Sequence, residues 1–105
     1  SDIKSISLGN GETYTCKAFI LATGGRSKTI GATGENEFKG RGISYCATCD
    51  GDFFQDKEII VVGGGNSALE EAVSLTKYAS KLTIVHMLSD WQAFDHAVDE
   101  MKAHE

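Results

Sequence analysis

The feature that most constrains the fold of this sequence is an apolar run that leads directly into a cluster of glycines. Glu58-Ile59-Ile60-Val61-Val62 is followed at once by Gly63-Gly64-Gly65. A continuous apolar run of this length is typical of a strand covered on both faces, as in a parallel sheet. Ser67 stands three residues before Glu70, a capping-box spacing that predicts the start of a helix. The sequence therefore predicts an α/β fold that begins with a strand, a glycine turn and a helix.

A second strand and a second helix are predicted after this unit. Residues 82–86 predict the strand, and Ser89 and Gln92 form another capping-box spacing. Strand, helix and strand in this order form a unit with a right-handed crossover. Two parallel strands alone bury too little surface for independent stability, so we expect the chain to be a fragment of a larger protein; the alternative is that the N-terminal hairpin pairs with this unit in a way that the sequence does not reveal. The predicted inner faces of the two helices are Leu69, Ala72, Val73 and Thr76, and Trp91, Phe94, Val98 and Met101.

The N-terminal part predicts a β-hairpin. Residues 3–8 alternate between apolar and polar side chains, Gly9-Asn10-Gly11 offers a turn, and residues 13–21 predict the returning strand. Cys16, in this second strand, is expected to be a small core residue. Residues 25–42 are rich in Gly, Ser, Lys and Thr, which indicates a connection between domains.

Composition excludes several classes of function. With 105 residues the chain can form one domain, and its net charge of -5 without a basic cluster argues against a nucleic-acid surface. No apolar run approaches the roughly 20 residues that span a bilayer, and the N-terminus carries no signal-like segment. Three cysteines are an odd number, which is common in a cytosolic redox or metal protein. We therefore expect a cytoplasmic protein.

The motif Cys46-x-x-Cys49 is the strongest chemical signal. Two intervening residues allow the sulfurs to meet in a small ring, so the disulfide is readily reduced and the thiol pKa can be low. A buried structural pair and a zinc site are the alternatives. A zinc site would need a second cysteine pair or a pair of histidines, but Cys16 and the three histidines are scattered along the sequence. Asp50 follows directly and is expected either to move protons or to serve as a turn or capping residue.

The motif Gly63-x-Gly65-x-x-Ala68 predicts a dinucleotide-binding loop. The first glycine makes the tight turn, the second leaves room for a pyrophosphate, and the small Ala68 lets the helix pack closely on the strand. The helix N-terminus then offers free N–H groups to the anion. A purely structural glycine turn is the alternative.

The residue that would select between NAD and NADP is not defined by the usual rule. That rule places an acidic residue about 20 positions on for the NAD ribose, or an arginine for the NADP phosphate. Here the region reads His86-Met87-Leu88-Ser89-Asp90, with no acid at the strand end and no arginine. His86 is expected either to donate a hydrogen bond to the nucleotide or to be an ordinary strand-end histidine.

Four segments match one family in order and spacing, within a match that runs from about residue 13 to 86. They are residues 20–24 (ILATG), 38–44 (FKGRGIS), 46–51 (CATCDG) and 63–72 (GGGNSALEEA). Through them the chain resembles bacterial-type, low molecular weight thioredoxin reductase. The resemblance implies Rossmann-like three-layer domains for FAD and NAD(P). Residues 1–28 would be the tail of the first FAD-domain segment, and residues 29–105 would be part of the NAD(P)-binding domain.

The resemblance also implies a chemistry. Electrons would pass from NADPH or NADH through FAD to the cysteine pair, and then to thioredoxin or a similar dithiol protein, within a homodimer. Cys49 would face the flavin, Cys46 would exchange with thioredoxin, and Asp50 would be the acid–base group. The implied cofactor-binding residues are Thr23 and Gly24 for FAD, and Gly63, Gly65, Asn66, Ser67, Ala68 and His86 for the nucleotide.

The chain departs from the family in two respects. The FAD pyrophosphate loop and the closing FAD segment are not in this sequence, so this chain alone is not expected to hold FAD or to complete a catalytic cycle. The family's run of His-Arg-Arg with a further arginine is replaced by residues 86–92 (HMLSDWQ). NADPH, NADH and ferredoxin therefore all stay open as donors. A redox-inert nucleotide-binding module and a zinc-binding interaction module are the alternatives outside the enzyme class.

Overall fold

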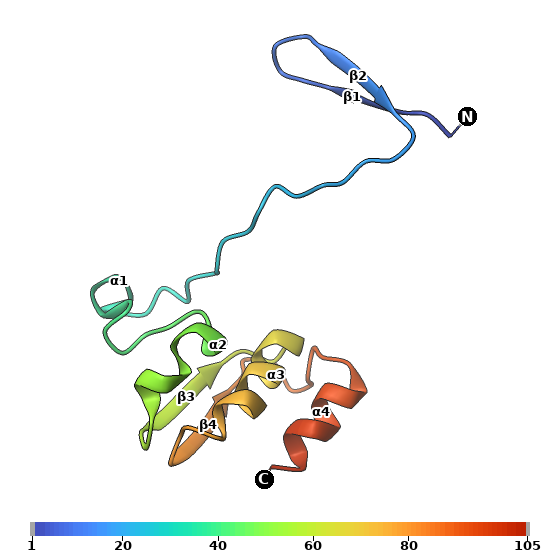
Figure 1. Cartoon of the computed structure of the whole chain (residues 1–105). Helices are drawn as coiled ribbons and strands as arrows, with labels where there is room; N and C mark the ends of the chain where they lie inside the picture. The colour runs from blue at the N-terminus through green and yellow to red at the C-terminus, as the bar shows by residue number, and fades with distance from the viewer. Residues whose placement is uncertain (1, 105) are drawn as a thin grey trace.

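The computed structural model describes residues 2–104, and in it the chain has two parts of unequal size (Figure 1). Residues 2–33, the hairpin arm, consist of a β-hairpin and an extended segment. Residues 34–104, the compact unit, contain all the helices in the described part of the chain. The radius of gyration is 19.1 Å, whereas a compact domain of this length has about 13 Å. The arm therefore extends away from the compact unit, as Figure 1 shows.

The hairpin pairs β1 (Lys4–Ser7) with β2 (Thr13–Cys16) in antiparallel register. The predicted turn is confirmed: the Gly11 N–H donates to the Leu8 carbonyl over 3.0 Å, and Gly11 has a φ of 89°. The returning strand ends at Cys16 and not at residue 21, and residues 17–33 contain no helix or strand. The prediction of a core position for Cys16 is wrong. Its side chain is half-buried, because no further layer packs on the two strands.

The sheet of the compact unit pairs β3 (Glu58–Val62) with β4 (Lys81–Val85) in parallel, and Glu58 lies opposite Lys81. The chain thus forms the expected α/β unit, a hairpin and a parallel strand pair. The prediction that β3 is covered on both faces is wrong for residues 2–104. Ile60 and Val62 are 66% and 52% exposed, because the helices of the compact unit cover only the other face.

The core lies between the sheet and two helices, α3 (Asn66–Leu75) and α4 (Asp95–Lys102). Leu69 is fully buried at its centre. The predicted inner face of the first helix is largely right, except that Leu75 replaces Thr76, which lies exposed at the helix end. The core cluster consists of Leu69, Ala97 and Met101, with Val73, Ile84, Trp91, Ala93 and Val98 packed against it.

Both predicted helix starts are wrong. α3 begins at Asn66, one residue before Ser67, and its N-cap is Gly65 without a side-chain cap. α4 begins at Asp95, so Trp91 and Phe94 precede it, and Phe94 is 66% exposed and does not face the core. The start of α4 is displaced because backbone N–H groups before this helix form hydrogen bonds with the glycine loop and the start of α3.

Residues 92–94 bind the glycine loop instead of starting a helix. The Gln92 N–H donates to the Gly64 carbonyl over 2.8 Å, and the Phe94 N–H donates to Asn66 Oδ1 over 2.7 Å. These hydrogen bonds join the segment after β4 to the start of α3. A helix capped by Ser89 would use the Gln92 N–H for its cap and the Phe94 N–H for its first turn.

Three short helical elements precede β3: α1 (Glu35–Phe38), α2 (Ala47–Asp50) and η1 (Gly51–Phe54). α2 packs on α3, and η1 follows it directly. A Cβ atom at Gly51 would lie 2.7 Å from the ring of Tyr78, so only glycine fits at this junction. Among residues 2–104, no helix is long and apolar enough to cross a membrane.

Candidate active site

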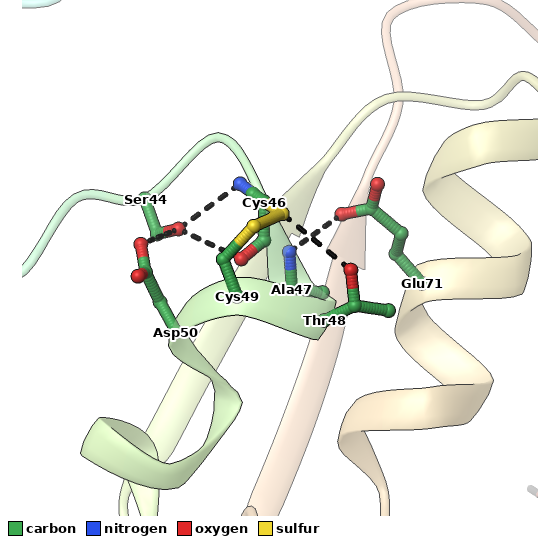
Figure 2. The surroundings of a disulfide bond; sticks show 7 residues. All are labelled: Ser44, Cys46, Ala47, Thr48, Cys49, Asp50 and Glu71. Carbon is green, nitrogen blue, oxygen red and sulfur yellow. Dashed lines mark hydrogen bonds between the residues drawn. A yellow bond between two sulfur atoms is a disulfide. The ribbon is translucent and has the colours of Figure 1, made fainter.

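The predicted cysteine pair forms a disulfide across the single turn of α2. Cys46 is the N-cap residue and Cys49 lies in the turn, with their Cα atoms 5.3 Å apart. The Cys46 carbonyl accepts hydrogen bonds from the N–H groups of Cys49 (3.2 Å) and Asp50 (3.1 Å). Cys49 is the more exposed of the two residues, and Cys46 is half-buried. Cys49 therefore brings the disulfide to the surface of the compact unit, and Figure 2 shows the residues around it.

Ser44 connects the disulfide to Asp50. The Ser44 hydroxyl donates to Asp50 Oδ2 over 2.5 Å and accepts the Cys46 N–H over 3.0 Å. In Figure 2 the Asp50 carboxylate turns towards Ser44, on one side of the disulfide. Within residues 2–104, neither oxygen of Asp50 has a hydrogen bond to either sulfur. The contact between Asp50 and the cysteine pair is thus indirect and passes through Ser44.

Glu71 anchors α2 from the opposite side. Its Oε2 accepts the N–H of Ala47, the first residue of α2, over 3.0 Å. Glu71 lies on α3, so this hydrogen bond joins the disulfide turn to the helix that begins at the glycine loop. The Thr48 hydroxyl lies 3.5 Å from Cys46 Sγ on the same side (Figure 2).

Glu35 is the buried charged residue of the described chain, with 5% of its surface exposed. Its carboxylate accepts the Tyr45 hydroxyl over 2.6 Å and the backbone N–H groups of Ile30, Gly31 and Ala32. The hydrogen bond from Tyr45 and those from the backbone lower the pKa of Glu35, against the effect of burial. The same contact raises the pKa of Tyr45. This cluster joins the end of the hairpin arm to the residue before Cys46.

The glycine loop lies at the N-terminus of α3. Gly63 has a φ of 141°, and a Cβ atom on it would lie 3.0 Å from Cβ of Ala68. Gly65 is the N-cap, and no side chain caps the helix. The first N–H groups of α3, beginning with those of Asn66 and Ser67, therefore stay free of a side-chain partner, as an anion-binding helix start requires.

His86 closes one side of this loop. A Cβ atom on Gly64 would lie 2.2 Å from His86 Nδ1, so the histidine ring occupies the space that a side chain there would need. The ring stacks on Trp91 at 5.3 Å, and its Nε2 lies 2.8 Å from the Asp90 carbonyl. Beyond it Met87 is 90% exposed. The surface next to the loop thus presents an apolar side chain directly after His86.

The structure groups the predicted site residues into three places. Cys46, Cys49 and Asp50 lie together at α2. The residues predicted to bind the nucleotide lie between the end of β3 and the first turn of α3, with His86, which follows β4, beside them. Thr23 and Gly24 lie exposed in residues 17–33, the extended segment of the hairpin arm. No cluster of three or more His, Cys, Asp or Glu residues that could hold a metal ion occurs among residues 2–104.

Sequence reasoning missed Ser44, Glu71 and Glu35. Ser44 had a local signal, since a serine hydroxyl often accepts the N–H two residues on, here that of Cys46. Glu71 had none, because it lies 24 positions from its partner Ala47. Glu35 precedes its partner Tyr45 by 10 positions, and no pattern in the sequence marks that contact.

Comparisons with known proteins agree with this geometry. A family model described as pyridine nucleotide-disulphide oxidoreductase matches residues 2–105. A thioredoxin reductase from Listeria monocytogenes is 54% identical over 85 residues, which cover 81% of this chain. The chain spans about a quarter of the length of that relative, 26%.

Two solved structures show the same relation. Thioredoxin reductase from Lactococcus lactis matches with a TM-score of 0.73 and 40% identity, over 93% of this chain and 32% of that one. A ferredoxin-flavin thioredoxin reductase from Clostridium acetobutylicum matches with a TM-score of 0.54 and 35% identity, over 90% of this chain and 33% of that one.

Proposed function

The chain belongs to the pyridine nucleotide-disulphide oxidoreductase family, and we propose that it carries the redox disulfide of a flavin-dependent thioredoxin-disulfide reductase. One observation carries the proposal: the Cys46–Cys49 disulfide lies at the surface beside Asp50 and is joined through Glu71 to the helix of the glycine loop. A redox-inert module has no need of an accessible disulfide beside an acid.

The proposal divides the chain as its family resemblance implies. Residues 1–28 belong to the FAD-binding part, and residues 29–105 to a three-layer NAD(P)-binding domain. The division is supported by the extended backbone of residues 17–33, which separates the hairpin from the compact unit. The exposed face of the β3–β4 sheet, with Ile60 and Val62, leaves room for a further layer.

The disulfide exchange uses this chain's own residues. In the reduced dithiol, the Cys46 thiolate attacks the disulfide of thioredoxin, forms a mixed disulfide and releases one thiolate of the partner. Cys49 then attacks Cys46, which restores the Cys46–Cys49 bond and releases the second thiolate. Two electrons move from the cysteine pair to thioredoxin. The proton that Cys46 loses when it forms the thiolate and the proton that Cys49 loses when it attacks Cys46 are taken up by the two released thioredoxin thiolates. Asp50, through Ser44, is the acid–base group beside this step.

The described residues do not by themselves enclose a flavin. Thr23 and Gly24 lie exposed in the hairpin arm, in a segment that forms no helix or strand. FAD, which would pass two electrons to the cysteine pair, is therefore assigned to the protein as a whole, with Cys49 on the side that faces it.

The residues at the start of α3 fit the pyrophosphate of a pyridine nucleotide. Gly63 and Gly65 present backbone without side chains, Ala68 lies close behind, and α3 has no side-chain cap. Asn66, Ser67 and His86 complete the site, which would supply two electrons as hydride when the nucleotide is bound. The free N–H groups of α3 would bind the anion, and His86, next to Gly64, would contact the bound nucleotide.

The donor is NADH or NADPH in this proposal, and reduced ferredoxin is the second candidate. The second candidate is favoured by one observation: the surface after His86 carries Met87, Leu88 and Asp90, and no arginine that could bind a 2′-phosphate. The similarity to a ferredoxin-flavin thioredoxin reductase supports it as well. We also propose that the complete protein is a homodimer and that it is located in the cytoplasm.

The test uses the flavoprotein that contains this chain, mixed anaerobically with NADPH, NADH or reduced ferredoxin. We expect one donor to bleach the flavin absorbance and to support reduction of thioredoxin. Cys46→Ser and Cys49→Ser should abolish thioredoxin reduction, and Cys16→Ser, in the hairpin, is the matched control that should retain it. Thioredoxin reduction that survives both Cys46→Ser and Cys49→Ser would overturn the proposal. Bleaching by ferredoxin alone would select the second candidate.

A further inference from the structure

We propose that Ser44 is a positioning residue for the redox disulfide and that it acts by holding the Asp50 carboxylate beside the cysteine pair. The inference rests on the proposed redox role of Cys46 and Cys49. It assigns to Ser44 a task that the disulfide motif itself does not contain, since Ser44 lies two residues before the motif.

The first step of the argument is the direction of the Ser44 hydrogen bond. A hydroxyl has one hydrogen to donate, and two oxygens lie near that of Ser44: Asp50 Oδ2 at 2.5 Å and the Cys46 carbonyl at 3.2 Å. The Cys46 carbonyl already accepts two backbone N–H groups. A charged acceptor makes the shorter and stronger bond, so the hydrogen points to Asp50.

The second step is what this bond fixes. The lone pairs of the Ser44 oxygen accept the Cys46 N–H over 3.0 Å, so one hydroxyl joins the carboxylate of Asp50 to the backbone of Cys46. Figure 2 shows Ser44 between the two, with the disulfide on the far side. Oδ2 is held by Ser44. Oδ1 has no hydrogen-bond partner among residues 2–104 and is the oxygen left to carry a proton.

The third step is the chemistry that needs this placement. When dithiothreitol reduces the disulfide, one of its thiolates attacks one sulfur, the Cys46–Cys49 bond breaks, and the released sulfur takes up a proton. The second dithiothreitol sulfur then closes its own ring and releases the other cysteine. Two electrons and two protons pass from dithiothreitol to the pair. The Asp50 carboxylate, held in place by Ser44, can take up a proton from water on its free oxygen and pass it to the released sulfur.

The experiment measures reduction of the Cys46–Cys49 disulfide by dithiothreitol in the complete protein across a range of pH, with alkylation to stop the reaction. Ser44→Ala should slow the reaction about tenfold, the loss expected for one hydrogen bond to a charged group. Ser44→Thr keeps the hydroxyl and should stay within about twofold of the wild type. Ser74→Ala, which removes an exposed hydroxyl of α3, is the matched control.

Two readouts separate positioning from a merely structural role. The ratio of the Ser44→Ala and wild-type rates should change with pH, because the lost function is proton transfer. In an Asp50→Ala background, Ser44→Ala should have less than about a twofold further effect, because Ser44 acts through Asp50. An equal loss at every pH, or an equal loss with and without Asp50, would overturn the proposal.

The choice of dithiothreitol keeps this test separate from that of the proposed function. The reaction needs neither flavin, nucleotide donor nor thioredoxin, so a protein that fails to reduce thioredoxin still reports on Ser44. If Ser44→Ala does not fold, the comparison of Ser44→Thr with Asp50→Ala decides. A Thr variant as slow as Asp50→Ala would then contradict the proposal.

Discussion

The hairpin arm and the compact unit contain the same kinds of apolar side chain but bury them to very different extents. Ile20 and Leu21 in the arm are 88% and 73% exposed, whereas Leu69 in the compact unit is fully buried. The arm has one two-stranded hairpin, and such a hairpin alone is marginally stable in water. The compact unit packs two helices on one face of a sheet. Local strand propensity therefore shapes the arm, while burial stabilises the compact unit.

Glu35 is the point at which the two parts meet. Its carboxylate binds the backbone of residues 30–32 at the end of the arm and the Tyr45 hydroxyl beside the disulfide turn. Glu35 is thus a buried charged residue that accepts hydrogen bonds from both the hairpin arm and the compact unit. Substitutions should have effects that decrease in the order core, Glu35 cluster, hairpin arm and exposed sheet surface.

The largest expected effect is that of Leu69→Ala. Leu69 is in contact with residues of α4 and β4, and a leucine truncated in such a core costs about 2–5 kcal/mol of unfolding free energy. Chemical denaturation followed by the fluorescence of Trp91, the single tryptophan, measures the loss. Leu21→Ala is the same change in the arm and should cost less than about 0.5 kcal/mol. Equal losses for the two variants would remove the distinction between the parts.

The next effect is that of Glu35→Gln. The amide keeps one oxygen and loses the charge, so the hydrogen bonds from the N–H groups of Gly31 and Ala32 lose their charged acceptor and become weaker. We expect hydrogen exchange at these two amides to become roughly tenfold faster, with the hairpin and the core unchanged. Glu37→Gln, on the same helix and exposed, is the matched control. Unchanged exchange at Gly31 in Glu35→Gln would mean that the carboxylate does not hold the arm.

The same cluster has a defined pH window. The pKa of Glu35 is lowered from 4.5, mainly by the Tyr45 hydrogen bond, so its contribution is present above that value and is lost as the pH falls through the lower pKa of the folded state. The pKa of Tyr45 is raised from 10.0, so its contribution is lost only as the pH rises through that higher value. Exchange at Gly31 measured against pH should show protection between these limits. Loss of protection near neutral pH would contradict the assignment.

A smaller effect is expected for Gly11→Ala in the hairpin turn. Gly11 has a φ of 89°, a conformation in which an alanine costs about 1 kcal/mol. That cost is large for a lone hairpin, so the cross-strand amide signals of β1 and β2 should weaken while unfolding of the compact unit stays the same. Gly9→Ala, at a position without positive φ and with free space around it, should leave the hairpin intact. A change in the Trp91 unfolding curve would mean that the arm supports the core.

The sequence predicted those features that depend on neighbouring residues. The turn at Gly11, the strands β3 and β4 and the disulfide between Cys46 and Cys49 follow from short patterns, and each is present. The buried stripe of α3 follows from its helical period, apart from its last member. These features could be predicted because the interactions that form them lie within a few residues of the chain.

What the sequence did not predict depends on contacts between distant segments. The starts of α3 and α4 were misplaced because Asn66 and Phe94, which are 28 positions apart, bind each other. The exposed face of β3 was missed because the continuous apolar run of this strand does not indicate whether one face or both faces are covered. Glu71 was missed because its role depends on where α3 lies relative to α2.

The smallest expected effect is that of a substitution at an exposed position of the compact unit. It tests whether the loss of unfolding free energy depends on burial or on the part of the chain in which a residue lies. Glu58 and Lys81 face each other at the start of the β3–β4 ladder, 4.0 Å apart, with side chains 76% and 67% exposed. Such surface pairs contribute about 0–1 kcal/mol, so Glu58→Gln should change the unfolding free energy by less than about 0.5 kcal/mol. Denaturation in low and high salt measures it, with Lys57→Gln as the neighbouring control. A loss near that of Leu69→Ala would mean that strand register depends on the ion pair. A negligible loss would place this exposed position with the arm, and burial alone would then explain the difference between the two parts.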